Sequence, residues 1–328
     1  MSFTLIDSSA AGALIPTEAA ASVIKAAAEQ SVALQLARRV RMTTRDFEQP
    51  ILSETVEAYW VQAGERKMTD SASWEGVMLH AEELAVIVVA DLDVIDDSSV
   101  NIWAELQGEF GTAIAKALDA AVIGGINRPA SWPPSIVEGA TTAGQVIDVV
   151  SPPAAGGVYG DLALVLDELE TASVDATGWA AKRALRGMMR RARAADGQLL
   201  GDYSLDSAWD LPFTWAIGGT LGASTLVVAG DWSQAVVGIR QDMRVEMFRE
   251  GVIQDGAGAI VANLLQEDRA AVRLTFRAGY ATANPVRRTE TGNVQSFPFA
   301  VLTDTGVQGP EPDPGTTETR RGRKGAED

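Results

Sequence analysis

The stretch that decides the fold is YWVQAGERKMTDSASWEGVMLHAEELAVIVVADLDVIDDSSVNIWAELQGEF, residues 59–110. Apolar residues alternate with polar ones on the way into it, from Ile51 to Val61, and again from Val77 to Val89. This period of two predicts two extended strands joined by the polar segment 62–76. An isolated two-stranded hairpin is marginally stable in water, so we expect the long hairpin over residues 49–91 to rest on a neighbour.

A helix follows the acidic step at the end of this hairpin. Asp97 or Ser98 is positioned to cap it, apolar residues recur every three to four positions from Trp103 to Val122, and Gly124 and Gly125 end it. This is the strongest helical pattern in the chain. The three prolines of NRPASWPPS, residues 127–135, then predict a loop.

The first 40 residues resemble an arm more than a domain. Pro16 and Thr17 precede a helical run in which Thr17 is a suitable cap and Glu18 favours the positive helix end. The apolar stripe is thin and consists of Val23, Ile24, Val32, Leu34 and Leu36. Such a stripe is too small for an independent core, so the segment is expected to pack on something else.

Residues 141–240 have the pattern of a mixed α/β unit. Two helices are predicted, DLALVLDELETA at 161–172 and the basic WAAKRALRGMMRRARAAD at 179–196. Strand-like runs are FTWAIGG, STLVVAG and QAVVGIR, and alternating strands continue from 242 to 286 around an acidic bend. The Pro/Gly/Thr/Glu-rich tail after residue 303 offers few apolar side chains, so disorder is expected there.

Composition excludes several classes of protein. The chain has 328 residues of which 46% are hydrophobic, enough for a sizeable core. No window approaches the roughly 18 apolar residues of a membrane span, and the N-terminus lacks a secretory pattern, so we expect a soluble protein that is not exported. The absence of cysteine excludes disulfides, thiolate metal sites and a cysteine nucleophile.

The charge balance argues against a DNA-coating protein. Lys and Arg number 27 against 44 Asp and Glu, a formal net charge of −17, whereas phosphate binding is driven by Lys and Arg. A surface that encloses DNA without gripping it would tolerate this charge.

Candidate catalytic and metal-binding residues each have a simpler structural explanation. His80 is the only histidine and no nucleophile pattern accompanies it. The oxygen-rich DLDVIDD, residues 91–97, is also suited to strand-end and helix-cap roles. DGAGAIVA, residues 255–262, is a poor match to the dinucleotide fingerprint, and no phosphate-binding GxxxxGK[ST] loop occurs. We therefore expect no catalytic residue, no cofactor and no metal.

The most conspicuous positive feature is the basic run on the second predicted helix. It contains Lys182, Arg183, Arg186, Arg190, Arg191 and Arg193. A solvated face or ion pairs with an acidic neighbouring subunit are favoured over phosphate contact.

Taken in order, these parts resemble the major capsid proteins of tailed phages. GALIPTEAAASVIKAAAEQS, residues 12–31, looks like the family's arm, and residues 59–110 look like its E-loop, return strand and spine helix. DLPFTWA and LVVAGDWSQAVVGIRQDMRVEMF resemble the central A-domain leading back to the P-domain, and residues 264–288 its closing strand. No single motif is diagnostic, and the order of the parts carries the resemblance.

The resemblance implies an α+β fold of the Hong Kong 97 phage type. Its parts would be an N-terminal arm at 1–48, an E-loop at 49–91, a P-domain with the spine helix at 92–135, an A-domain at 136–240, a P-domain return at 241–302 and a flexible tail at 303–328. Arm and hairpin would lie across adjacent subunits.

The implied function is self-assembly, as pentamers and hexamers, into the icosahedral or prolate shell around double-stranded DNA. Expected partners are the portal protein and separate scaffolding and decoration proteins, with no membrane and no sequence-specific DNA contact. Assembly would occur in the bacterial host cytoplasm and the product would be the virion capsid. Expected contacts between subunits are Arg66, Lys67, Trp74, Lys182, Arg183, Arg186 and Arg190.

Two alternatives stay open at this point. An encapsulin-like nanocompartment shell shares the fold, and a cytoplasmic α/β enzyme that binds a nucleotide or metal would rest on DGAGAIVA and DLDVIDD. Some relatives crosslink an E-loop lysine between subunits. Lys67 lies in that loop, but no acceptor can be placed, so a solvated lysine is expected.

Overall fold

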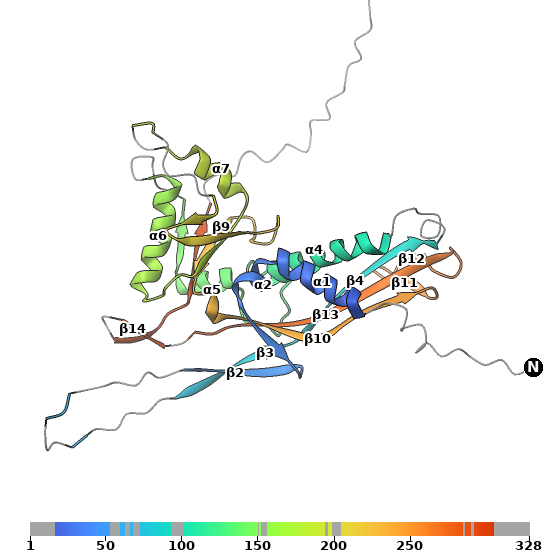
Figure 1. The fold of residues 1–328 in the computed structure, drawn as a ribbon, viewed down its shortest axis with the longest axis horizontal. Coiled ribbons are helices and arrows are strands. Elements are labelled where there is room, and N and C mark those ends of the chain that lie inside the picture. The colour runs from blue at the N-terminus through green and yellow to red at the C-terminus, as the bar shows by residue number, and fades with distance from the viewer. Residues whose placement is uncertain are drawn as a thin grey trace, which may run out of the picture.

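The helix predicted after the acidic step is α4, Ile102–Val122, and the first lobe of the protein is built on it (Figure 1). The structure is a computed structural model that describes residues 17–52, 60–62, 66–67, 73–92, 102–149, 151, 156–193, 196–198, 205–284, 286–289 and 292–304. The predicted glycine stop is confirmed, because α4 ends just before Gly124 and Gly125, and Gly125 has a φ of +73°. The expected caps Asp97 and Ser98 lie outside the described residues.

The arm helices pack on α4 of the same chain. They are α1, Thr17–Gln30, and α2, Val32–Leu36, and their side chains Val23 and Leu34 are buried in the core that α4 shares. The prediction that this segment packs on something else is confirmed. Residues 23–37 pack on the core of their own chain. The prediction that they lie across a neighbouring subunit is therefore wrong.

Glycine allows α1 and α4 to approach closely. A Cβ added at Gly111 would lie 2.8 Å from the Cβ of Ala26 and 3.1 Å from the backbone nitrogen of Ala27. Gly108, one turn earlier on α4, has nothing within 4 Å of the same added atom. The contact between the two helices therefore depends on the missing side chain at position 111.

A buried carboxylate on α4 holds the start of α2. Asp119 accepts hydrogen bonds from Ser31 Oγ at 2.6 Å, the Val32 nitrogen at 2.9 Å and the Ala33 nitrogen at 3.0 Å. These donors include free N–H groups of a helix start, where negative charge is favoured. Burial is the largest influence on Asp119 and raises its pKa to about 6, although the three hydrogen bonds lower it.

Beneath α4 lies a four-stranded sheet in the order β1, β10, β13, β4, with β1 parallel to β10 and the other neighbours antiparallel. The strands are β1 Arg38–Met42, β10 Ala235–Phe248, β13 Arg269–Thr282 and β4 Glu82–Asp91. The alternating strands predicted in the region 242–286 are thereby confirmed for β10 and β13.

The hairpin consists of β2, Asp46–Leu52, and β3, Trp74–His80, and it projects away from both lobes (Figure 1). The interpretation of residues 77–91 as one return strand is wrong. The chain leaves the hairpin at Ala81, and β4 then pairs with β13 in the body of the first lobe. Val56 and Tyr59, predicted on the outgoing strand, lie outside the described residues.

The second lobe contains a six-stranded sheet in the order β5, β16, β9, β6, β8, β7. Its strands are β5 Val146–Asp148, β16 Phe299–Thr303, β9 Thr225–Gly230, β6 Gly178–Ala181, β8 Leu211–Trp215 and β7 Ser207–Ala208. Successive residues of β9 and β16 point into two different cores, so the central strands are buried on both faces.

Helices cover both faces of this sheet. The helix α6, Val158–Thr171, and α7, Ala184–Arg191, lie on one face, and α5, Ile136–Ala143, contributes to the core on the other. The predicted helix at 161–172 is confirmed, but the predicted helix 179–196 begins later. Residues 178–181 form the buried strand β6, because their small and aromatic side chains fill the sheet interior.

The end of the chain's described part belongs to the second lobe. Residues 299–302, which we expected in the P-domain return 241–302, and Thr303, which we expected at the start of the flexible tail, form β16 inside the six-stranded sheet. The smaller elements are η3 Trp232–Gln234, β11 Val252–Gln254, β12 Ile260–Asn263, β14 Val286–Thr289 and β15 Gly292–Gln295.

Gly111→Ala should destabilise the subunit by about 1–3 kcal/mol, because the new methyl group overlaps α1. Gly108→Ala, the same change in open space on the same helix, should stabilise it by about 1 kcal/mol. Urea unfolding of the unassembled subunit measures both. Equal effects of the two substitutions would contradict the close helix contact.

Asp119 should make the subunit less stable as pH rises from about 4 to 6. The folded subunit keeps a proton on Asp119 up to its raised pKa of about 6, whereas the unfolded chain has lost it above 3.8. Across this window the stability of the wild type should fall by about 3 kcal/mol relative to Asp119→Asn, which does not titrate. Unfolding free energies at several pH values test this, and parallel pH profiles of the two proteins would refute it.

Candidate assembly site

The root of the hairpin is fixed to the body. Leu79 is fully buried beside Met42 and Val236, and the indole Nε1 of Trp132 donates a hydrogen bond to the His80 carbonyl at 2.9 Å. The His80 ring contacts Asp46 across the hairpin, with Nδ1 2.7 Å from Oδ1. His80 therefore ties the two strands together at their base, in agreement with the structural role expected for it.

Beyond the root the hairpin exposes large side chains. The Trp74 side chain is 68% exposed and Trp60 is completely exposed. Arg66 and Lys67, two further expected contacts, are also exposed. Within the described residues β2 and β3 pair only with each other, so the hairpin has aromatic surface and strand edges that its own body does not cover.

A second exposed apolar surface lies on β11 and β12, at the far end of the long sheet (Figure 1). We call it the β12 tip, and it consists of Val252, Ile260, Val261 and Leu265, each more than half exposed. The sequence analysis did not predict this surface, because the region was interpreted as an acidic bend and its DGAGAIVA motif was weighed only as a nucleotide-binding loop. The clustered apolar residues of AIVANLL were the available signal.

The basic run is divided by the structure. Lys182 precedes α7 and its Nζ donates to the Ala223 carbonyl at 2.7 Å; burial lowers its pKa, although Asp304 opposes this. Arg183, Arg186 and Arg190 follow at spacings of three and four residues, and so lie on one face of α7. The guanidinium carbon of Arg186 lies 4.1 Å from the ring centre of Trp215 on β8. Sequence gave no signal for this pair.

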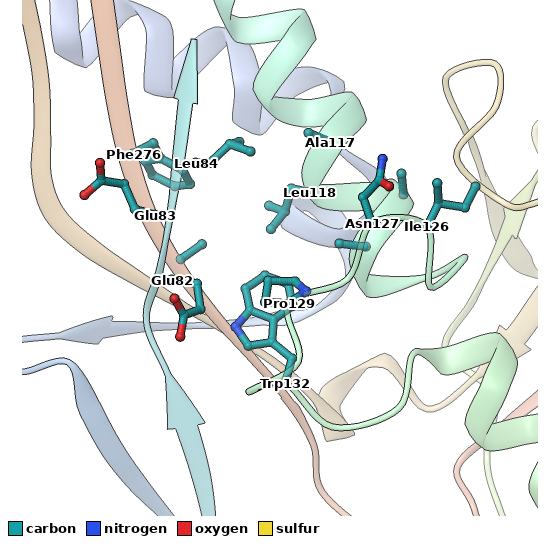
Figure 2. Close-up of a pocket in the computed structure, with 13 residues that line it drawn as sticks. Glu82, Glu83, Leu84, Ala117, Leu118, Ile126, Asn127, Pro129, Trp132 and Phe276 are labelled. Carbon is teal, nitrogen blue, oxygen red and sulfur yellow. The ribbon is translucent and has the colours of Figure 1, made fainter. Parts of the chain in front are cut away.

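A cavity of about 280 Å³ lies between α4, β4, β13 and the loop around Trp132 (Figure 2). Leu84, Leu118 and Phe276 line it, with Glu82 and Glu83 at its side. Glu82 accepts from Ser131 at 2.8 Å, and this bond, with Arg45, lowers its pKa despite some burial. Glu83 pairs with Arg277 at 3.0 Å. Both carboxylates are thus structural, and the cavity presents no nucleophile paired with a base.

The other candidate motifs also have structural roles in the described chain. Asp91 of DLDVIDD pairs with Arg269 at 2.7 Å, while Asp93, Asp96 and Asp97 lie outside the described residues. Within the part of the chain that the structure covers, no three acidic or histidine side chains converge as metal ligands. In DGAGAIVA, Asp255 Oδ1 accepts from the nitrogens of Ala257 and Ala259 and closes the β11–β12 turn, so it forms no nucleotide-binding loop.

Among the described helices, none combines the length and the apolar character that a membrane crossing requires.

Comparison with known proteins gives a consistent result. The model of the phage capsid family matches residues 11–286. A solved structure from Mycobacterium phage Cain is similar with 32% identity and a TM-score of 0.70, covering 85% of this chain and 91% of that one. One from Mycobacterium phage Adephagia has 30% identity and a TM-score of 0.70, covering 92% and 98%.

A more distant structure, described as the capsid of an empty GTA particle computed with C5 symmetry, has 17% identity and a TM-score of 0.59, covering 82% of this chain and 88% of that one. It supports the fold alone. No curated protein matches the sequence.

Two adjacent leucines should separate surface from core. Leu265 on the β12 tip is 69% exposed and Leu264 only 2%. Leu264→Ala should lower the unfolding free energy by about 2–5 kcal/mol, because it leaves a cavity. Leu265→Ala should change it by no more than about 0.5 kcal/mol while weakening self-association. Urea unfolding and sedimentation velocity measure the two effects, and loss of stability in the Leu265 variant would disprove an uncovered tip.

Proposed function

The chain belongs to the phage capsid family, and from this premise we propose that its exposed hairpin and β12 tip hold neighbouring subunits together in the shell. The protein is a structural, shell-forming capsid protein of the virion, with the α+β fold of the Hong Kong 97 type. It assembles from copies of itself.

The hairpin is the observation that carries the proposal. Its root is buried and hydrogen-bonded to the body, whereas Trp60 and Trp74 further out have no cover. Tryptophan is enriched among the residues that dominate binding energy at protein interfaces. A hairpin with a fixed base and an uncovered aromatic surface is suited to lie on a neighbouring subunit, and Arg66 and Lys67 are then placed for contacts with carboxylates of this acidic chain.

The two lobes fit the two parts of a capsid subunit. We assign the four-stranded sheet with α4 to the P-domain, the six-stranded sheet with α6 and α7 to the A-domain, and β2–β3 to the E-loop. A-domains would surround the axes of pentamers and hexamers in an icosahedral or prolate shell. The cyclic symmetry named for the GTA capsid is consistent with such rings.

The remaining partners follow from the family and stay proposals. Double-stranded DNA would be enclosed without sequence-specific contacts, in line with the net charge of −17. A portal protein, with separate scaffolding and decoration proteins, would join the shell in the host cytoplasm, and the subunit would have no catalytic role. No observation favours an encapsulin-like compartment over a phage shell.

Trp60→Ala should impair assembly without unfolding the subunit. Loss of an interface tryptophan costs about 2 kcal/mol or more, so the concentration needed for assembly should rise at least about tenfold. Negative-stain electron microscopy and sedimentation of wild type and variant measure this.

Ile126→Ala supplies the control, since Ile126 is a partly exposed apolar residue in the loop after α4. It should assemble like the wild type. A wild-type protein that stays monomeric or dimeric, alone and with its scaffold, would refute the function. Wild-type shells that form equally well with Trp60→Ala would refute only the role of the hairpin.

A further inference from the structure

The face of α7 that carries arginines has no acidic partner within the described chain. Arg183, Arg186 and Arg190 make no ion pair there, although the same chain forms several on its first lobe. We call these three residues together with Trp215 the α7 surface. Arg183 and Arg190 are exposed, so their charge is available to a second molecule.

Two donors of the α7 surface are buried without an acceptor. The Nε of Arg186 and the Nε1 of Trp215 are both shielded from solvent, and neither has a hydrogen-bond partner. The two groups are stacked at 4.1 Å and line the same cavity of about 570 Å³. Buried donors are satisfied in the great majority of native proteins, so the pair leaves hydrogen-bonding capacity that the described part of the subunit does not fill.

The geometry of the donors favours a carboxylate. A guanidinium group binds both oxygens of a carboxylate in a fork, and Arg183 and Arg190 on this surface are exposed. The only carboxylate in the cavity lining is that of Glu29, which is largely exposed and lies 3.9 Å from Lys25. The cavity lining therefore offers more guanidinium and indole donors than carboxylate acceptors.

The complementary surface is on α6 of the same lobe. Asp167, Glu168 and Glu170 are exposed and form no ion pair within the described part of the chain. We call them the α6 surface. Figure 1 shows α6 along one flank of the lobe and α7 at its top, so the two surfaces lie on different parts of the lobe.

We propose that the α7 surface binds carboxylates of the α6 surface on a neighbouring copy of this chain. Such a contact joins two different patches, and repeated around an axis it closes a ring when the rotation permits. The inference rests on the proposed shell function and specifies the A-domain contact within a capsomer. Phosphate groups of DNA are the competing occupant.

Charge reversal tests the contact in the full-length protein. Arg190→Glu should reduce the yield of closed shells about tenfold, because like charges then face each other across the interface. Asp167→Lys with Glu170→Lys should do the same, and combining these with Arg190→Glu should restore most of the yield. Arg191→Glu is the matched control, since it makes the same charge change on the adjacent face of α7.

The outcomes separate the possibilities. Wild-type yield from Arg190→Glu, or no recovery in the combined variant, would overturn the proposal while leaving the capsid function intact. Full yield with less DNA retained would also overturn it and assign the α7 surface to phosphate. Absence of wild-type shells would instead contradict the function itself.

Crosslinking tests the same contact without relying on charge. The chain has no cysteine, so Arg190→Cys and Glu170→Cys, introduced into separate copies and co-expressed, can form a disulfide only between subunits. Oxidised shells should show the mixed dimer, and shells without it would count against the contact. An Arg191→Cys copy paired with Glu170→Cys should give much less of that product.

Discussion

The Asp119 carboxylate fixes the relation between the arm helices and the rest of the subunit. It lies in the core and accepts three hydrogen bonds from groups at the start of α2. These bonds fix the direction that the chain takes after α1. The Leu36 side chain at the end of α2 reaches within 3.5 Å of the Cβ position at Gly178 in the second lobe. The short helix α2 therefore contacts Asp119 of α4 on one side and the second lobe on the other. The Asp119 carboxylate can be ionised inside the core because three hydrogen-bond donors contact it.

The sequence predicts the parts of this fold that have one buried face. The three-to-four spacing of α4 reflects burial on one side, and the alternation around the hairpin corresponds to burial at its root, at Phe47, Val77 and Leu79. In the second lobe this relation fails for β6 and β16, which are covered on both faces and have no alternation to detect. FAVLT at 299–303 thus gave no strand pattern of its own, and WAA at 179–181 was assigned to the following helix.

The functional surfaces show the same limit. Arg66, Lys67 and Trp74 could be proposed as contacts from the sequence because they lie in or beside a polar segment with no local use for them, and their role stays a prediction. The division of the basic run into a bound Lys182 and an exposed arginine face depends on where α7 begins, which composition does not give. The stacking of Arg186 on Trp215 joins residues 29 positions apart on a helix and a strand, so it follows only from the packing of the lobe.

The two longest strands have a mechanical consequence. β10 and β13 each comprise 14 residues and run side by side, roughly 45 Å at the usual rise per residue, from near the hairpin root toward the β12 tip. A pull between these two ends acts along the strands. The hairpin continues into β4 at the root, whereas the tip continues into β13, so the hydrogen bonds between β4 and β13 are loaded together in shear and do not open one after another as in peeling. The subunit therefore resists stretching most strongly along the line that connects its two uncovered surfaces.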